Sequence, residues 1–233
     1  MPCTLPASLA DAAVCRGSFH AVLGGEAGEA VFADFSAALQ KAQAEGRILT
    51  ASLFRYENHL FFYAEGLNRP FTPQGLCPAL DAALLPWPPA LGETAPRPWA
   101  AMQPYFYHDV PTTAADRQQG RCPQRRRGRI ALLPPDKWCS YMEHHLRIVT
   151  EGLVEGDRWH LICVQEGVLF SYLEEPRTNV NIRHKPGAHS PELDAWIAAD
   201  PESHFARFTP EQKAHPDSGH NFVFLPRIAG TED

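Results

Sequence analysis

Apolar residues recur along the chain at two spacings, and the order of these spacings predicts the order of the secondary structure. In the first half, four segments carry the short apolar runs typical of strands: residues 18–23, 48–56, 60–65 and 105–110. Helical spacing over residues 26–45, followed by Gly46, predicts a helix that ends at this glycine. A shorter helix is expected over residues 76–85. The first half is therefore predicted to run strand, helix, hairpin, helix, strand.

The second half repeats this order of elements. Strands are predicted over residues 130–133, 159–164, 168–174 and 221–225. Asp136 is expected to begin a helix that continues to about residue 154, because it follows two prolines and precedes apolar residues at helical spacing. Another helix is expected over residues 191–199.

The two predicted hairpins match each other in sequence. Leu60–Glu65 and Leu169–Glu174 are identical at four of six positions, Leu-Phe-x-Tyr-x-Glu. We therefore predict a tandem duplication of one α+β ferredoxin-like unit, with copies over residues 1–115 and 125–233 and a polar linker over 111–124. Because such a sheet carries helices on one face, its other face must be buried. The two units are expected to form a dimeric α/β-barrel within one chain, a pseudo-dimer.

Composition narrows the partners and the compartment. A net charge of -6 and a pI near 6.0 disfavour nucleic acid, and the basic cluster of Arg125–Arg127 and Arg129 is interpreted as a strand edge or linker. The six cysteines have no zinc-like spacing, and no apolar run reaches the ~20 residues of a membrane span. No signal peptide is evident at the first residues. We expect a soluble, cytoplasmic protein with no nucleic-acid or membrane partner.

Tyr141 and His145 are the strongest candidates for chemistry. They are four residues apart on a predicted helix and so project from the same face. A phenol beside an imidazole can serve as an acid/base pair. The same spacing also serves ordinary packing, so the pattern by itself leaves both interpretations open.

The surrounding sequence resembles the L-rhamnose mutarotase family over about residues 126–226. The matching features are Pro135-Asp136 before the helix, Tyr141-x-x-x-His145, the hairpin ending in Leu169–Glu174, Trp196 and the strand Phe222–Leu225. The resemblance implies an isomerase of carbohydrate metabolism that interconverts the α and β anomers of a free aldose. It implies His145 and Tyr141 as catalytic acid and base, with no metal and no cofactor.

The resemblance also implies a sugar-binding pocket, a small-molecule sugar as the partner, and a monomeric pseudo-dimer or a higher homo-oligomer. The residues expected to bind the sugar are Arg126, Trp159, His160, Arg183, Trp196 and Phe208. Two features depart from the family. Phe208-Thr209 stands where the family has two tryptophans, and Trp159-His160 replaces its Asn-Tyr.

A third departure is an insertion over residues 176–190. It contains the basic or amide residues Arg177, Asn179, Asn181, Arg183, His184, Lys185 and His189. One interpretation is solvated surface. The alternative is a lid whose cations select a carboxylated or phosphorylated sugar.

The first half is predicted to be a structural copy without a site. Aligned on the hairpins, Phe32 falls at the position of Tyr141 and Ser36 at that of His145. His20, His59, His108 and Asp109 are assigned no chemistry. Two further functions stay open: a non-catalytic sugar-binding or regulatory protein, and a cofactor-free or haem-linked monooxygenase of the same barrel architecture, because one scaffold hosts unrelated sites.

Overall fold

The computed structural model describes residues 6–108, 110–177, 182–212 and 221–231, which divide into two compact units. The first unit comprises residues 1–102, 111–123 and 226–233, and the second comprises residues 103–110 and 124–225. The chain therefore crosses between the units more than once. The predicted domains, 1–115 and 125–233, remain a prediction.

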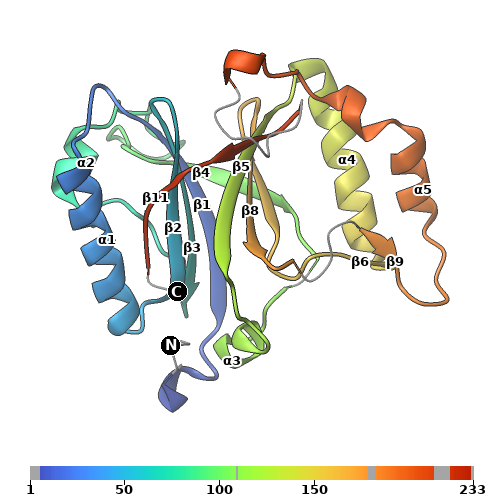
Figure 1. The fold of residues 1–233 in the computed structure, drawn as a ribbon, viewed down its shortest axis with the longest axis horizontal. Helices are drawn as coiled ribbons and strands as arrows, with labels where there is room; N and C mark the ends of the chain where they lie inside the picture. The colour runs from blue at the N-terminus through green and yellow to red at the C-terminus, as the bar shows by residue number, and fades with distance from the viewer. Residues whose placement is uncertain (1–5, 109, 178–181, 213–220, 232–233) are drawn as a thin grey trace. The chain divides into compact units, whose positions relative to one another are not determined.

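The first unit is an antiparallel sheet in the order β4-β1-β3-β2-β11. Its elements are η1 (Ala7–Leu9), β1 (Val14–Val22), α1 (Glu29–Ala44), β2 (Ile48–Tyr56), β3 (His59–Leu67), α2 (Pro78–Ala82), the start of β4 (Ala100–Phe106), α3 (Ala114–Gln118) and β11 (Arg227–Gly230). α1 and α2 cover one face of the sheet (Figure 1). The alternation of β3 sends Leu60, Phe62 and Ala64 into the core beneath α1.

The opposite face of β3 carries a buried ionic network. The Tyr63 hydroxyl donates to Glu65 Oε1 at 2.7 Å. Arg117 Nη2 lies 2.7 Å from Glu65 Oε1, and Arg121 Nη1 lies 2.6 Å from Glu65 Oε2. Burial by itself raises the pKa of Glu65, but the guanidinium groups of Arg117 and Arg121 hold it well below its usual value. The network ties α3 to the sheet.

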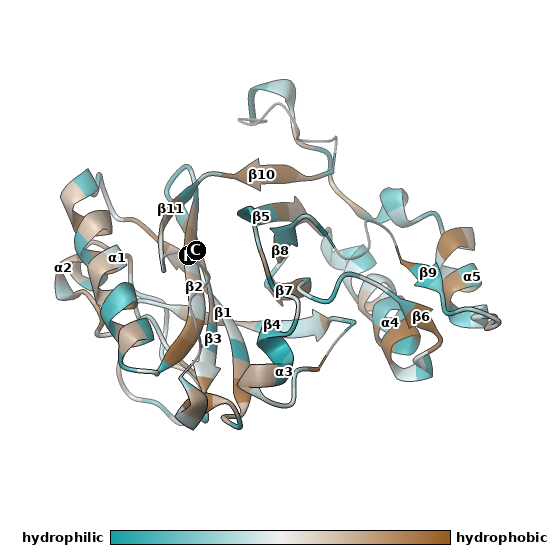
Figure 2. Cartoon of the chain, turned by 60° about the horizontal axis from the view of Figure 1, so that its bottom comes forward, coloured by the Kyte–Doolittle hydropathy of each residue, from teal (hydrophilic) through white to brown (hydrophobic). Residues whose placement is uncertain are grey.

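The second unit has the sheet order β10-β5-β8-β7-β4. Its elements are the end of β4, β5 (Arg125–Leu132), α4 (Pro135–Glu151), β6 (Val154–Glu155), β7 (Leu161–Gln165), β8 (Val168–Glu175), β9 (Arg183–His184), α5 (Pro191–Ala198), η2 (Pro201–His204), η3 (Pro210–Gln212) and β10 (Val223–Leu225). α4 and α5 pack against each other, and their buried side chains join those of the sheet in one core. The apolar β10 pairs with the middle of β5, residues 128–130 (Figure 2).

Strand β4 belongs to both sheets and corrects the predicted fold class. Its first residues pair with β1, from Ala100 to Met102, and its later residues, from Gln103 to Phe106, pair with β7. The strands thus form one continuous nine-stranded antiparallel sheet, with β6 and β9 as a separate pair. The prediction of two tandem ferredoxin-like units joined as a pseudo-dimer is therefore wrong, because β4 is shared and β11 returns the C-terminal segment to the first sheet.

Three local predictions are also corrected. The strand expected at 105–110 runs instead over Ala100–Phe106, which is β4. The expected linker contains α3, whose Arg117 is fully buried by its ion pair with Glu65. The arginine cluster is not a linker, because it belongs to β5, which pairs with β8 along its length and with β10 only over residues 128–130. Within the described residues, no helix is long and apolar enough to cross a membrane.

Candidate active site

A cavity of about 340 Å³ lies in the second unit between its helices and its sheet. One wall is apolar and is formed by Phe106, Ile162, Ile182, Leu193, Trp196, Phe205 and Phe222. The polar side chains in the lining are His108, Arg129, Tyr141, His145, Asp157, His160, Arg177 and Glu202. We call this the helix–sheet cavity. Apolar linings with converging polar groups are typical of a small-molecule site.

His145 is held by its own helix in one defined tautomer. Its Nδ1 lies 2.8 Å from the carbonyl oxygen of Tyr141, one turn earlier in α4. A carbonyl oxygen only accepts, so Nδ1 must carry the proton and donate it. In the neutral ring this leaves Nε2 with a free lone pair. His145 is thus oriented as a proton acceptor through Nε2.

Aromatic rings surround the imidazole of His145. The ring centroids of Tyr141, Phe106 and Trp196 lie 4.2, 4.6 and 4.7 Å from it. This burial lowers the pKa of His145 to about 4, although the hydrogen bond to Tyr141 opposes the shift. His145 is therefore neutral at physiological pH, which is the state that a general base requires.

Tyr141 contributes its backbone and its ring rather than a side-chain hydrogen bond to His145. Its hydroxyl lies in the neighbourhood of Tyr105, with ring centroids 5.9 Å apart. Burial raises the pKa of Tyr141 to about 12, and that of Tyr105 rises well above its usual value through burial and the nearby Tyr141. Both phenols stay protonated and can act only as hydrogen-bond partners near neutral pH.

Arg129 brings a positive charge to the cavity. Its guanidinium carbon lies 4.3 Å from the centroid of Phe222, a cation–π contact. Its Nε is buried and has no hydrogen-bond partner among the described residues. Burial, and then the charge of Arg177, lower the pKa of Arg129 to about 10, so it remains a cation at neutral pH.

The remaining polar side chains of the cavity differ in whether they have hydrogen-bond or ion-pair partners. Asp157 Oδ2 and Arg177 Nε form an ion pair at 3.0 Å and neutralise each other. Glu202 accepts a hydrogen bond from the amide of Asn221. His160 is buried, and its Nε2 has no partner in the part of the chain that the structure describes. Burial, followed by the charges of Arg129 and Arg177, lowers the pKa of His160 well below its usual value.

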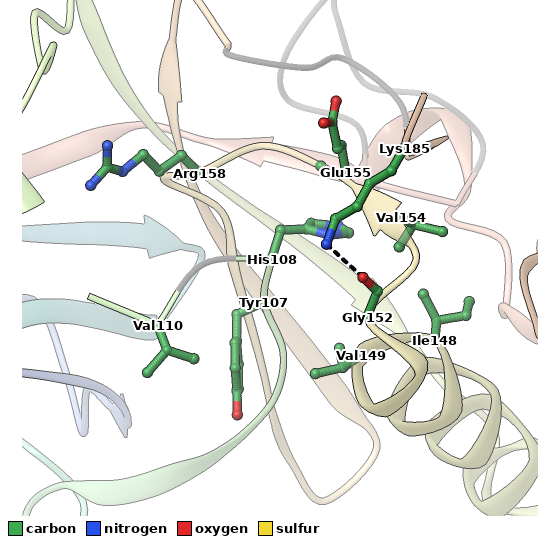
Figure 3. A pocket seen from close by; sticks show the side chains of 11 residues that line it. Tyr107, His108, Val110, Ile148, Val149, Gly152, Val154, Glu155, Arg158 and Lys185 are labelled. Carbon is green, nitrogen blue, oxygen red and sulfur yellow. Dashed lines mark hydrogen bonds between the residues drawn. The ribbon is translucent and has the colours of Figure 1, made fainter. Parts of the chain in front are cut away.

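A second hollow of about 470 Å³ adjoins this region (Figure 3). It lies around the end of α4, where Lys185 Nζ donates to the carbonyl oxygen of Gly152 at 2.6 Å. His108 lines both hollows and so stands in the wall between them. Its ring lies where a Cβ on Gly156 would be, 1.9 Å from His108 Cδ2, so a glycine is needed at that position.

The first unit fills the equivalent space with aromatic rings. In the first unit, Phe19 pairs with Phe62 across neighbouring strands. The equivalent pair in the second unit is Arg129 and Ser171. The Phe19 and Phe62 centroids are 6.3 Å apart, and Phe35 packs edge-on against Phe62 at 5.8 Å. Replacing two phenylalanines by an arginine and a serine leaves room in the second unit. Ser36, at the position of His145, accepts a hydrogen bond from the backbone of Gly230 in β11.

The structure brings four of the predicted site residues together in the cavity and leaves four outside its lining. Tyr141, His145, His160 and Trp196 line it. Arg126 lies 3.6 Å from Glu174 on the other face of β5, and Arg183 pairs with Glu155 at the surface. Trp159 and Phe208 are buried elsewhere. Asn179, Asn181 and Asp109 lie outside the described residues.

Sequence reasoning missed Arg129, His108 and Phe106. Arg129 was passed over as part of a basic cluster, although the alternation of a strand puts Arg126 and Arg129 on opposite faces. A correct register would have identified it. His108 and Phe106 come from β4 and the segment after it, which had been assigned to the first half, and no sequence signal brings them to α4.

Comparisons with known proteins give only distant structural likeness. The chain resembles a "putative monooxygenase" from Lactobacillus acidophilus NCFM, with TM-score 0.41 and 7% identity over 94% of this chain and 96% of that one. It also resembles a "putative monooxygenase" from Fusobacterium nucleatum subsp. nucleatum (TM-score 0.40, 8% identity, 95% of each chain) and an anthrone oxidase-like protein (0.38, 7%, 92% of each). No family model and no curated protein matches.

The predicted membership of the L-rhamnose mutarotase family is wrong. No family model matches, and the three structures are described as monooxygenases or as anthrone oxidase-like. The predicted isomerase activity on a free sugar followed from that membership and is wrong as well. The cavity offers a physical reason, because a sugar presents hydroxyl groups that need many hydrogen-bond partners, whereas Asp157 and Arg177 pair with each other and Glu202 with Asn221.

Proposed function

We propose that the helix–sheet cavity takes a proton from a small, flat, aromatic substrate and thereby starts its oxygenation by dioxygen. The observation that carries the proposal is the state of His145. Its Nδ1 is committed to the Tyr141 carbonyl, and its neutral Nε2 belongs to a ring that lines the cavity. The monooxygenase alternative drawn from the sequence is thereby preferred to the sugar-binding one.

The low pKa of His145 is compatible with a base. Burial disfavours the imidazolium, which keeps the ring unprotonated. Removing a proton from the substrate creates an anion beside the new imidazolium, and this opposite charge offsets the cost of burial. A base that becomes stronger as negative charge develops stabilises the transition state more than the ground state.

The other walls support a flat, anion-forming substrate. Phe106, Trp196 and Phe222 offer ring faces and edges against which an aromatic substrate packs. Arg129 supplies a cation with a desolvated guanidinium, which stabilises an enolate or phenolate more strongly than a solvated charge would. Delocalisation over an aromatic system makes such an anion accessible to a histidine base.

The proposed reaction balances for a substrate with a CH₂ group flanked by aromatic rings. His145 Nε2 takes one proton and leaves a delocalised carbanion. Dioxygen accepts one electron from this carbanion, and the resulting radical pair joins as a peroxide anion. The imidazolium returns its proton to the outer oxygen, and loss of water then leaves a carbonyl group. One dioxygen is consumed, and the CH₂ becomes C=O with release of one water.

The test measures dioxygen uptake with a panel of aromatic substrates that have an acidic CH₂ or phenol, such as anthrone and hydroquinones. We expect His145→Ala to lower the rate about 10²- to 10⁴-fold, the usual contribution of a general base. His189→Ala is the matched control, because its side chain is 76% exposed in the same unit. Circular dichroism verifies that both variants fold.

Three results would contradict the proposal in part or in whole. If His145→Ala consumed dioxygen at the unchanged rate, His145 would have no role as the base. If the protein exchanged substrate CH₂ protons with deuterium but consumed no dioxygen, the oxygenation step would be wrong and only the proton abstraction would stand. Ligand binding without exchange or uptake would indicate a binding protein.

A further inference from the structure

Among the described residues, Arg129 differs from the other arginines of the same strand in having no carboxylate within ion-pair distance. Arg127 Nη1 lies 2.9 Å from Glu175, and Arg126 Nε lies 3.6 Å from Glu174. These carboxylates come from β8, which pairs with β5. The register instead places Ser171 opposite Arg129. A serine cannot neutralise a guanidinium, so this cation faces the cavity without a counter-charge from the sheet.

A second unsatisfied group lies in the same cavity. His160 is 5% exposed, and its Nε2 has no hydrogen-bond partner among the residues that the structure describes. Buried polar groups are nearly always paired, so each exception calls for a ligand, a water or a function. Arg129 Nε and His160 Nε2 are two such exceptions in the lining of one cavity.

The acidic residues nearby are already engaged. Asp157 pairs with Arg177, and Glu202 accepts from Asn221. The charge of Glu202 favours the charged form of Arg129 from a distance, but among the described residues no carboxylate lies within ion-pair distance of its guanidinium. Arg129 is therefore the cation that a bound anion would meet. The fold does not require an arginine here, because the corresponding residue of the first unit is Phe19.

We propose that the helix–sheet cavity recognises a carboxylate on its aromatic ligand, through Arg129 and His160. The ring of Phe106 lies near both histidines of the site, His145 and His160. Its ring centroid lies 4.6 Å from that of His145 and 6.3 Å from that of His160. A ligand ring that packs along Phe106 then places its carboxylate at Arg129 and His160 and its reacting atom near His145. The substrate class is an aromatic carboxylic acid.

This inference rests on the proposed function for the aromatic part of the ligand, but its test measures binding alone. The affinities of 2-naphthoate, its neutral analogue 2-naphthamide and 2-naphthol are determined by isothermal titration calorimetry at pH 7. We expect at least a tenfold preference for the carboxylate over the amide in the wild-type chain. We also expect the pKa of His160, followed by NMR, to rise when naphthoate binds, since the carboxylate favours the imidazolium.

Substitutions test which residues cause the preference for the carboxylate. Arg129→Met should abolish the preference, so that naphthoate binds no more tightly than naphthamide, and His160→Phe should reduce the preference. Arg125→Met is the control, because Arg125 lies on the same strand with a side chain that is 58% exposed. It should leave both affinities unchanged. Arg129→Lys keeps the charge and should retain part of the preference.

Four outcomes would overturn the inference: equal wild-type affinities for naphthoate and naphthamide, a preference for naphthol over naphthoate, a preference that survives Arg129→Met, or no binding of any probe. The result is separable from the proposed function. Dioxygen uptake without a carboxylate preference overturns this inference alone, whereas a carboxylate preference without uptake of dioxygen by any substrate overturns the proposed oxygenation alone.

Discussion

The side chain of His145 donates from Nδ1 to the backbone carbonyl oxygen of Tyr141, at 2.8 Å. The two residues were selected from the sequence as a side-chain pair, and the structure connects them through the backbone instead. A histidine four residues after a carbonyl in a helix can reach it because the two lie on the same helical face. This contact decides which nitrogen of His145 carries the proton, and therefore which nitrogen can accept one.

The stability of the chain should depend on pH through its buried histidines. Burial lowers the pKa of His145 and of His108 from 6.5 to about 4. In the unfolded chain both protonate as the pH falls below 6.5, while in the folded chain they stay neutral until about 4. The unfolded state thus binds more protons in this window, and stability falls as the pH falls.

The expected loss is roughly 1 kcal/mol per histidine for each pH unit, since one pKa unit corresponds to about 1.4 kcal/mol. Urea unfolding at pH 7, 6 and 5 measures it. In His145→Phe, the free energy of unfolding should change less with pH, by the contribution of one histidine. An identical slope in this variant would show that His145 does not titrate as described.

Glu65→Gln should destabilise the first unit strongly. The substitution removes the charge that pairs with Arg117 and Arg121 and leaves two buried guanidinium groups uncompensated. Breaking a buried ion pair in this way costs about 3–5 kcal/mol. The free energy of unfolding in urea measures the effect. Glu93→Gln is the control, because its ion pair with Arg97 is exposed and should change stability by less than about 1 kcal/mol.

Gly156→Ala should displace His108. The new Cβ would lie 1.9 Å from Cδ2 of the His108 ring, so the ring must move out of the wall that it forms. We expect a loss of about 1–3 kcal/mol, the usual cost of overpacking. Thermal unfolding measures it, with Gly25→Ala as the control because a Cβ there meets no atom within 4 Å. Equal melting temperatures for the two variants would contradict the described position of His108.

Ser171→Phe should close the helix–sheet cavity. The substitution recreates in the second unit the residue that the first unit has at this position, Phe62, which lies opposite Phe19. A ring at position 171 would occupy the space beside Arg129, and binding of 2-naphthoate should fall at least tenfold. Calorimetry measures the affinity, and urea unfolding verifies that the chain folds. Undiminished binding would place the ligand outside this cavity.

The elements of the chain were largely predictable because apolar periodicity is a local property. β2 has the predicted bounds, Ile48–Tyr56, and α4 begins within one residue of the predicted start at Asp136. Prolines and glycines indicated where most of the predicted helices and strands end. β11 was missed because four residues are too few to show a period, and α3 was missed because its one large buried side chain is an arginine, Arg117.

By itself, the sequence determined the hairpins and the helix that presents Tyr141 and His145, since each depends on neighbours a few positions away. The tertiary structure alone decided the rest of the site. Strand register placed Arg129 rather than Arg126 at the cavity, opposite Ser171 instead of a carboxylate. The passage of β4 between the two sheets brought Phe106 to His145. Pairing partners depend on residues far apart in the chain, and a shift of one residue reverses the face of every side chain in a strand.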